Sequence, residues 1–137
     1  MTYTTLREKI AAEKIARAER YNEFAELWKR AYTAGIESGH AYNPRAMIVR
    51  ESGENGRQWL CPEGLCGFAW ITIRPANCSF ARYLKANNIG RKAYNGGWQI
   101  WISEFNQSME RKSVCASTIA QILNNAGINA YPGFRAD

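Results

Sequence analysis

The sequence has little histidine and proline, and it lacks a long apolar run. His40 is the single histidine among 137 residues, so any histidine-based acid–base or nucleophilic system would depend on that one side chain. No apolar run approaches the roughly 18 residues that a membrane span needs. The first nine residues have no apolar core of the kind that a secretory leader requires. We therefore expect a cytoplasmic protein with no membrane partner.

The common catalytic and phosphate-binding motifs are also missing. The sequence contains no Gly-x-Ser-x-Gly, no Walker loop and no His-Glu-x-x-His, and it offers no spaced pair of carboxylates near a plausible pocket. Only six acidic residues lie in 39–137. The sequence therefore favours a binding protein over an enzyme, and it predicts no catalytic residues and no cofactor.

The four cysteines allow three interpretations. Cys61 and Cys66 flank a four-residue turn, whereas Cys78 and Cys115 stand alone on stretches of helical character. A zinc site needs four converging ligands, usually from two short knuckles, and only one short pair is present. Reduced thiols that pack as small hydrophobic groups are the favoured interpretation, with no metal bound. A zinc site and a functional disulfide are the alternatives.

Positive charge is concentrated in the C-terminal part of the chain. Eighteen Lys and Arg against twelve Asp and Glu give a net charge of +6. Residues 1–38 hold seven basic and six acidic residues, and 39–137 hold eleven and six. The excess of +5 in the second part favours an anionic partner such as a nucleotide, a nucleic acid or an acidic surface. An ordinary soluble surface is the alternative.

Residues 5–38 predict one long helix. Thr5 and Glu8 have the spacing of a capping box, and apolar residues recur at helical spacing up to Tyr32. No proline interrupts the segment, and Gly35 and Gly39 mark its expected end.

The length of this helix exceeds that of a compact domain. About 32 residues span roughly 48 Å, whereas a compact chain of this size has a radius of gyration of about 14 Å. The helix should therefore overhang its domain and leave Tyr21, Phe24 and Trp28 in need of a cover. A second copy would supply it, which predicts a homo-oligomer through the N-terminal helix. A kinked helical hairpin that folds back on the domain is the alternative.

Residues 39–137 predict an α+β body behind the helical arm of 1–38. Pro62-Glu63-Gly64 separates two apolar runs, which indicates a hairpin whose second strand is 67–73. Further elements are expected at 46–51 (strand), 79–89 (helix), 98–102 (strand), 108–126 (helix) and 128–131 (strand). The predicted fold class is α+β, with a long N-terminal helix followed by a small antiparallel sheet with two further helices.

The start of the 108–126 helix is an unfavourable place for positive charge. Ser108 is a good N-cap, so Arg111 and Lys112 fall in the first turn, where the helix dipole disfavours a cation by about 0.3–1 kcal/mol. A bound anion would reverse this effect, because the free N–H groups and the guanidinium would point at it. Screening by Glu110 and solvent is the alternative.

Aromatic and basic residues elsewhere could complete a nucleotide pocket around this helix end. An aromatic ring beside a guanidinium holds a base and a phosphate. Trp98, Tyr94 or Phe80 would stack a base, and Arg82 or Arg74 would bind a second phosphate. The predicted ligand-binding residues are Arg74, Phe80, Arg82, Tyr94, Trp98, Gln107, Ser108 and Arg111. The alternative is that these aromatic side chains belong to the core.

Five segments within 44–137 resemble a family of small tailed-phage accessory proteins. They are Cys61-Pro-Glu-Gly-Leu-Cys-Gly-Phe-Ala-Trp-Ile, Phe80-Ala-x-Tyr-Leu-Lys, Ala93-Tyr-Asn-Gly-Gly, Glu104-Phe-Asn-Gln-Ser-Met-Glu-Arg-Lys and Ala126-Gly-Ile-Asn-Ala-Tyr-Pro-Gly-Phe-Arg-Ala-Asp137. Phe134 stands where the usual family ending has serine. In size, long helix and α+β body the chain is also similar to the phage Thoeris anti-defence sponges, which oligomerise through helices and sequester cyclic ADP-ribose-type signals.

These resemblances imply a phage-encoded anti-defence protein of the host cytoplasm. It would sequester an anionic cyclic nucleotide immune signal without hydrolysing it. A nucleic-acid-binding phage accessory protein is one alternative, and a protein inhibitor or virion component acting through the helical arm is another. We find no continuous basic stripe in the sequence, which favours a small phosphate-bearing ligand over a long polyanion.

Overall fold

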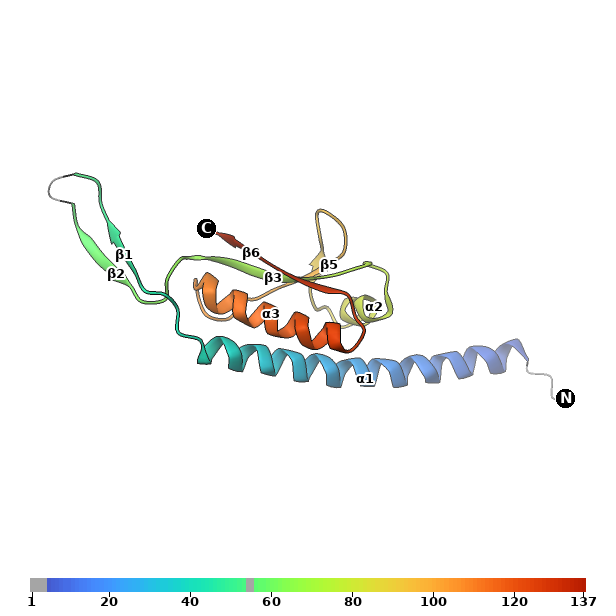
Figure 1. Cartoon of the computed structure of the whole chain (residues 1–137). Coiled ribbons are helices and arrows are strands. Elements are labelled where there is room, and N and C mark those ends of the chain that lie inside the picture. Colours follow the sequence, from blue (N-terminus) through green and yellow to red (C-terminus); the bar gives the residue numbers. More distant parts are fainter. Residues whose placement is uncertain (1–4, 54–55) are drawn as a thin grey trace.

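The computed structural model describes residues 5–53 and 56–137, and within them it shows an α+β fold (Figure 1). The helices are α1 (Leu6–Ala41), α2 (Ser79–Ala86) and α3 (Met109–Asn125). The strands are β1 (Met47–Arg50), β2 (Gln58–Cys61), β3 (Gly67–Ile73), β4 (Arg91–Lys92), β5 (Trp98–Trp101) and β6 (Ala130–Ala136). The predicted fold class, with a long N-terminal helix first, is confirmed.

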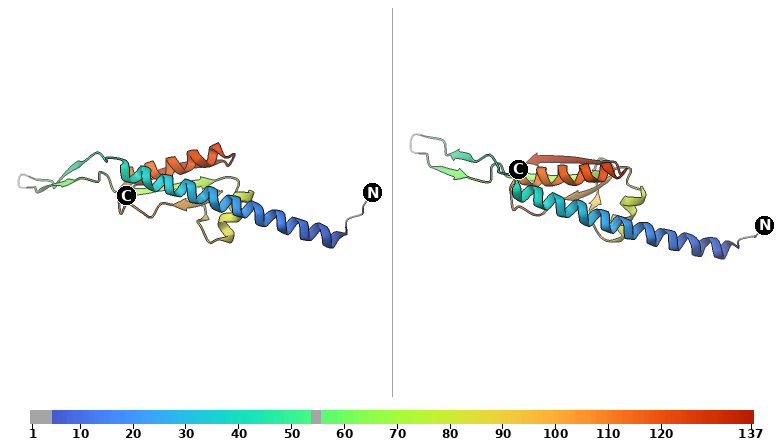
Figure 2. Two further views of the ribbon diagram at one scale, coloured as in Figure 1. Left: turned by 90° about the horizontal axis from the view of Figure 1, so that it is seen from below. Right: turned by 60° about the horizontal axis from the view of Figure 1, so that its bottom comes forward.

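Two antiparallel sheets are present in the described residues. Four strands form the main sheet in the order β4-β5-β3-β6, and β1 and β2 form a separate two-stranded ribbon. Helix α3 lies on one face of the main sheet, and α1 runs beside α3 and reaches α2 (Figures 1 and 2). No helix of the described residues lies on the other face of the sheet (Figure 1).

The alternation of side chains along β3 explains why one sheet face is buried. Ala69, Ile71 and Ile73 are fully buried beneath the helices, and Ile100 of β5, which pairs with Ile71, continues this core. The residues between them must point to the opposite face, because successive strand side chains alternate. The core therefore lies between the sheet and α3.

Helix α1 continues through both glycines that were predicted to end it. A Cβ atom at Gly35 would lie 2.6 Å from Cγ1 of Ile119, and one at Gly39 would collide with the ring of Phe105. These glycines therefore lie inside the helix, and they let its backbone approach α3 closely. The prediction that the helix ends near residue 38 is wrong for this reason, and α1 ends at Ala41.

The first half of α1 extends beyond the body, as predicted (Figure 2). Residues 5–20 are exposed apart from the half-buried Ala16. Thr5 and Glu8 form the predicted capping box, with the Thr5 hydroxyl accepting from the Glu8 N–H at 3.1 Å. The 36 residues of α1 span about 54 Å.

The aromatic residues of α1 are covered within the same chain. The ring centroids of Tyr21 and Tyr83 lie 5.6 Å apart, and those of Phe24 and Phe80 lie 5.3 Å apart, both edge-on. Trp28 also contacts Phe80, at 6.4 Å. The sequence argument that these side chains require a second copy is therefore wrong, because α2 supplies their cover.

The predicted hairpin across 62–64 is absent. β2 pairs with β1, not with β3, so the turn at 62–64 redirects the chain from the ribbon into the main sheet. A strand near 46–51 is confirmed as β1. Part of the expected Gly-rich turn, residues 54–55, lies outside the described residues.

The C-terminal segment is a longer strand than the sequence indicated. β6 extends the expected strand through residue 136 and pairs along the whole of β3. Pro132 is tolerated because β6 is an edge strand, where alternate N–H groups face outward. The helix begun by Ser108 is confirmed as α3, whereas α2 ends at Ala86 instead of 89. In the described ranges, no helix combines the length and apolar character of a membrane span.

Candidate functional site

Arg111 is held by three acceptors within its own chain. Its Nε donates to Oε2 of Glu63 at 2.6 Å, and its Nη1 donates to the carbonyl oxygens of Gly39 at 2.8 Å and His40 at 2.9 Å. Ser108 caps α3 by accepting from the Arg111 N–H at 3.3 Å, and its hydroxyl donates to the Glu63 carbonyl at 3.0 Å. The guanidinium and the Ser108 cap thus join the end of α1, the turn at Glu63 and the start of α3.

These contacts account for the positive charge at the start of α3 without an anion. Gly39 and His40 lie in the last turn of α1, where the helix dipole favours a cation. The unfavourable position of the Arg111 charge at the start of α3 is therefore offset by its favourable position at the C-terminal end of α1. Lys112 is buried, and its Nζ donates to the Gly67 carbonyl at 3.4 Å.

The predicted aromatic residues have different surroundings. Phe80 is 2% exposed and belongs to the core, as the alternative interpretation held. Trp98 packs against the core, and its Nε1 donates to the Ile89 carbonyl at 2.7 Å. Tyr94 is fully exposed in the turn between β4 and β5. Arg82 is exposed on α2.

The predicted ligand residues fall at opposite ends of β3. Gln107 accepts from the Gly67 N–H at 2.9 Å, which places it with Ser108 and Arg111 where β3 begins. Arg74 follows the other end of β3 and lines an open hollow of about 460 Å³ beside the Asn95–Gly97 turn. Six residue steps along β3 separate the two ends by about 20 Å. The predicted residues therefore do not form one pocket within a single chain.

The helix-free face of the main sheet has a different character, and we call it the outer face. It is defined by the side chains that alternate away from the core. The nine positions are Phe68, Trp70 and Thr72 of β3, Gln99 and Trp101 of β5, Arg91 of β4, and Tyr131, Gly133 and Arg135 of β6. None of these nine residues is acidic, although Asp137 follows β6 at one end.

Three aromatic rings form the centre of the outer face. Trp70 and Trp101 are register partners, with ring centroids 4.8 Å apart and planes inclined by 31°. Phe68 meets Trp101 edge-on at 5.8 Å. All three side chains are half-buried, so part of each ring remains open to solvent. On β6, Gly133 lies under the indole of Trp70, and a Cβ there would lie 2.5 Å from Trp70 Nε1.

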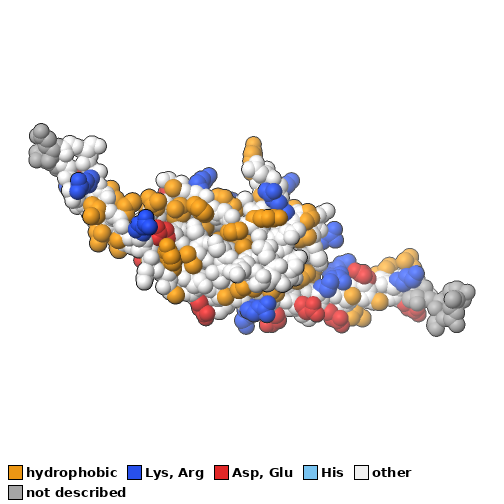
Figure 3. Space-filling model, viewed as in Figure 1, with side chains coloured by type: hydrophobic (Ala, Val, Ile, Leu, Met, Phe, Trp, Pro, Cys, Tyr) orange, Lys and Arg blue, Asp and Glu red, His pale blue; other side chains and the backbone are white. Residues whose placement is uncertain are grey.

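Two exposed arginines from the edge strands flank these rings. Cζ of Arg91 lies 4.6 Å from the centroid of Trp101, and Cζ of Arg135 lies 5.4 Å from that of Phe68. Stacking on a ring holds a guanidinium in place while its outer N–H groups stay free to donate. A hollow of about 360 Å³ beside Arg91 and Trp101 also adjoins Gln99. In Figure 3, most of the visible acidic side chains lie along α1, away from the sheet.

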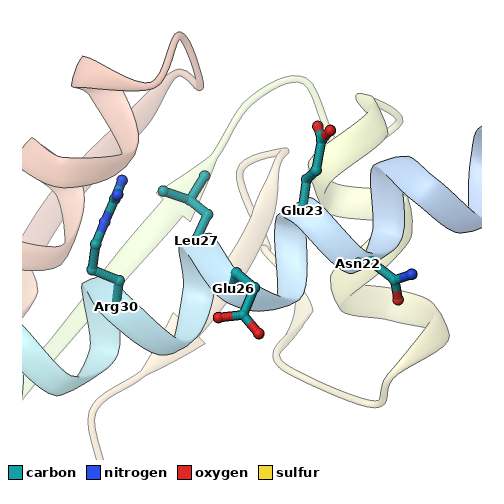
Figure 4. A pocket seen from close by; sticks show the side chains of 5 residues that line it. All are labelled: Asn22, Glu23, Glu26, Leu27 and Arg30. Carbon is teal, nitrogen blue, oxygen red and sulfur yellow. The ribbon is translucent and has the colours of Figure 1, made fainter.

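A larger hollow of about 530 Å³ lies on α1 (Figure 4). It is lined by Asn22, Glu23, Glu26, Leu27 and Arg30. All five belong to one helix, and two of them are carboxylates that would repel an anion. This hollow therefore suits a phosphate-bearing ligand less well than the outer face does.

All four cysteines are free thiols, but only Cys115 is buried in the core as the favoured interpretation expected. Cys66 is exposed, and Cys115 is fully buried beneath α1. Burial first, and the nearby Glu104 carboxylate second, raise the pKa of Cys115 to about 12. Among the described residues, no group of three His, Cys, Asp or Glu side chains converges as metal ligands would.

Sequence reasoning missed the outer face, although its signal was present. Phe68 and Trp70 occupy alternate positions of a strand whose other positions are small or aliphatic. Trp98 was selected as a base-stacking residue, but Trp101 is three residues further along the strand and so lies on the opposite face. In comparisons with known proteins, no family model, no curated protein and no solved structure matches this chain. Functional inference therefore rests on the geometry of the outer face.

Proposed function

We propose that the outer face binds single-stranded nucleic acid without chemical turnover. Bases would stack on Trp70 and Trp101, and phosphates would pair with Arg91 and Arg135. The supporting observation is the set of three contacting, partly exposed rings with an arginine stacked at either side. Aromatic rings on an open sheet face, next to basic groups, are a recurrent platform for single strands.

The shape of the outer face favours a strand over a small enclosed ligand. Pockets for small molecules bury most of the ligand surface, whereas this face is open and extends across the four strands of the main sheet. Its two arginines come from opposite edges of the sheet, β4 and β6. A strand that crosses the sheet would meet one arginine before the rings and one after them.

This proposal selects the nucleic-acid-binding accessory function from the alternatives that the sequence left open. It agrees with the +5 charge of residues 39–137 and with a phage-encoded accessory protein, which the resemblance implies. Sequestration of an anionic cyclic nucleotide remains the competing proposal, and it now needs a pocket formed between two chains.

Fluorescence anisotropy of a labelled single strand tests the proposal. We expect an unstructured oligothymidine to bind and the matching duplex to bind more weakly, because paired bases cannot stack on the rings. If Arg91 and Arg135 neutralise two phosphates, log K should fall with log salt concentration with a slope of about −1.4.

Matched variants separate the outer face from general charge. Arg91→Ala should weaken binding and reduce the salt slope by about 0.7. Arg17→Ala removes the same charge from the exposed arm and should have little effect. Trp101→Ala should weaken binding about tenfold through lost stacking, whereas Trp59→Ala, an exposed tryptophan on the ribbon, should not.

Two outcomes would contradict this function. Equal losses for Arg91→Ala and Arg17→Ala would show only nonspecific attraction to a basic protein. Tight binding of a cyclic nucleotide that is released unchanged on denaturation, with no binding of oligothymidine, would favour the sequestering function instead.

A further inference from the structure

The β1–β2 ribbon stands apart from the rest of the fold. Its two short strands project from the body (Figures 1 and 2). Ile48, Trp59 and Leu60 are 63%, 48% and 62% exposed, so apolar side chains occupy both of its faces. An isolated two-stranded ribbon is marginally stable in water. These observations indicate that the ribbon has a partner.

The outer edge of β1 has backbone groups positioned for another strand. The Glu51 N–H donates to the Arg57 carbonyl at 2.9 Å, which makes residues 51 and 57 a hydrogen-bonded pair across the ribbon. Hydrogen-bonded and non-hydrogen-bonded pairs alternate along an antiparallel ladder. The N–H and C=O groups of Ile48 and Arg50 therefore point away from β2. Such an edge is a template for pairing with another strand.

We infer that β1 pairs antiparallel with β1 of a second copy of this chain, about a twofold axis at Ile48. The two ribbons would form one sheet in the order β2-β1-β1-β2. Ile48 would exchange both backbone hydrogen bonds with the partner's Ile48. The exposed side chains of Leu60 and Ile48, which are register partners, would continue into the same two residues of the partner as one apolar row.

Charge complementarity selects this register. With Ile48 on the axis, Arg45 lies opposite the partner's Glu51, and symmetry repeats this ion pair at the other end. An axis at Arg50 would place two arginines opposite each other, and like charges at such positions are destabilising. An axis at residue 46 would bring Pro44, which has no N–H, opposite the partner's Ile48 and would remove hydrogen bonds. An axis at Val49 would also pair outward backbone groups, those of Ile48 with those of the partner's Arg50, but it would place Glu51 opposite the partner's Met47 and form no ion pair.

Glu51 is available for such a pair. Its contact with Arg57 is 3.7 Å long, and the Arg57 side chain is 84% exposed, so this surface ion pair contributes little. The inferred dimer therefore gains a pair at each end without breaking a strong one. It also differs from the sequence-based expectation, because the ribbon, not the N-terminal helix, joins the copies. This inference stands independently of the proposed function.

Analytical ultracentrifugation over a series of concentrations, with charge-reversed variants, tests the dimer. The unaltered chain should show a concentration-dependent dimer. Arg45→Glu and Glu51→Arg each create two like-charge pairs and should raise the dissociation constant about tenfold. The double variant restores opposite charges in reversed order and should recover most of the affinity.

Two further variants keep the test decisive. Ile48→Pro removes an outward N–H from each copy and should yield monomers, and circular dichroism and melting should show an intact body because the ribbon projects from it. Deletion of residues 1–18 should leave the dimer intact. A chain that stays monomeric at every concentration, a double variant no better than the single ones, or loss of the dimer on deletion of 1–18 alone would each overturn the inference.

Discussion

Replacement of Arg111 by alanine should destabilise the free protein. The two hydrogen bonds to the carbonyls of Gly39 and His40 involve a charged donor, and loss of such bonds costs about 1.5–3 kcal/mol. The ion pair with Glu63 adds less than about 1 kcal/mol, because the Glu63 side chain is 58% exposed. The substitution also removes the unfavourable interaction between the Arg111 charge and the dipole of α3, which stabilises the protein by about 0.3–1 kcal/mol. The expected net loss is about 2 kcal/mol.

Thermal unfolding followed by circular dichroism measures this loss. For a chain of this size, about 2 kcal/mol corresponds to a fall in Tm of about 8 °C. Glu63→Gln keeps an acceptor and removes only the charge, so its fall should be about 2 °C or less. Arg111→Lys should lie between wild type and alanine, because one ammonium cannot reproduce the fork that reaches both Glu63 and the end of α1.

The alanine variant also decides between two roles for this residue. An unchanged or raised Tm would refute the structural role, and it would return Arg111 to the anion-binding role that the sequence predicted. Most of the loss should persist in high salt, since hydrogen bonds to carbonyls are screened less than an exposed ion pair.

Three further predictions concern packing, ionisation and the arm. Gly35→Ala should lower the free energy of unfolding in urea by about 1–2 kcal/mol, because the new Cβ meets the buried Ile119 side chain. Ser38→Ala on the same helix is the control and should be nearly neutral. Equal effects of the two variants would contradict the close approach of α1 to α3. Burial raises the pKa of Cys115 from an ordinary 9.0 to about 12, so the thiol of the unfolded chain loses its proton at a lower pH than that of the folded chain. The free energy of unfolding should therefore fall as the pH rises from 9 to 12, and Cys115→Ala should reduce that slope. Deletion of residues 1–18 should change Tm by only a few degrees, since these residues contact little; a large fall would show that the arm is part of the core.

Local signals predicted most of the helices correctly. The capping pair Thr5 and Glu8 and the N-cap Ser108 act through contacts between near neighbours, so the sequence alone locates both helix starts. Gly35 was misread because a glycine that ends a helix and a glycine that admits a neighbouring helix look the same in one sequence. Only the position of Ile119 separates the two cases.

Long-range pairing explains the remaining differences. Pro62 and Gly64 give a genuine turn, but which strands pair depends on partners outside the turn, and β2 joins β1. The predicted ligand site does not assemble in one chain, because Arg74 and Arg111 lie at opposite ends of β3 and Arg111 instead bonds to Gly39, about seventy positions away in the sequence. Likewise, the outer face could be predicted only with the register between β3 and β5, which places Trp70 beside Trp101.

The close packing of α1 against α3 has a mechanical consequence for the exposed arm. Because α1 is one uninterrupted helix, residues 6–20 continue the axis of its second half, where Gly35 and Gly39 allow close packing against the body. These fifteen residues of helix extend this axis by about 22 Å. The arm is therefore a rigid extension of α1, and its direction is set where Gly35 and Gly39 pack against the body. Anything attached to its tip is held at a fixed distance and angle from the outer face, and a change in packing at residue 35 or 39 would swing that tip through an arc.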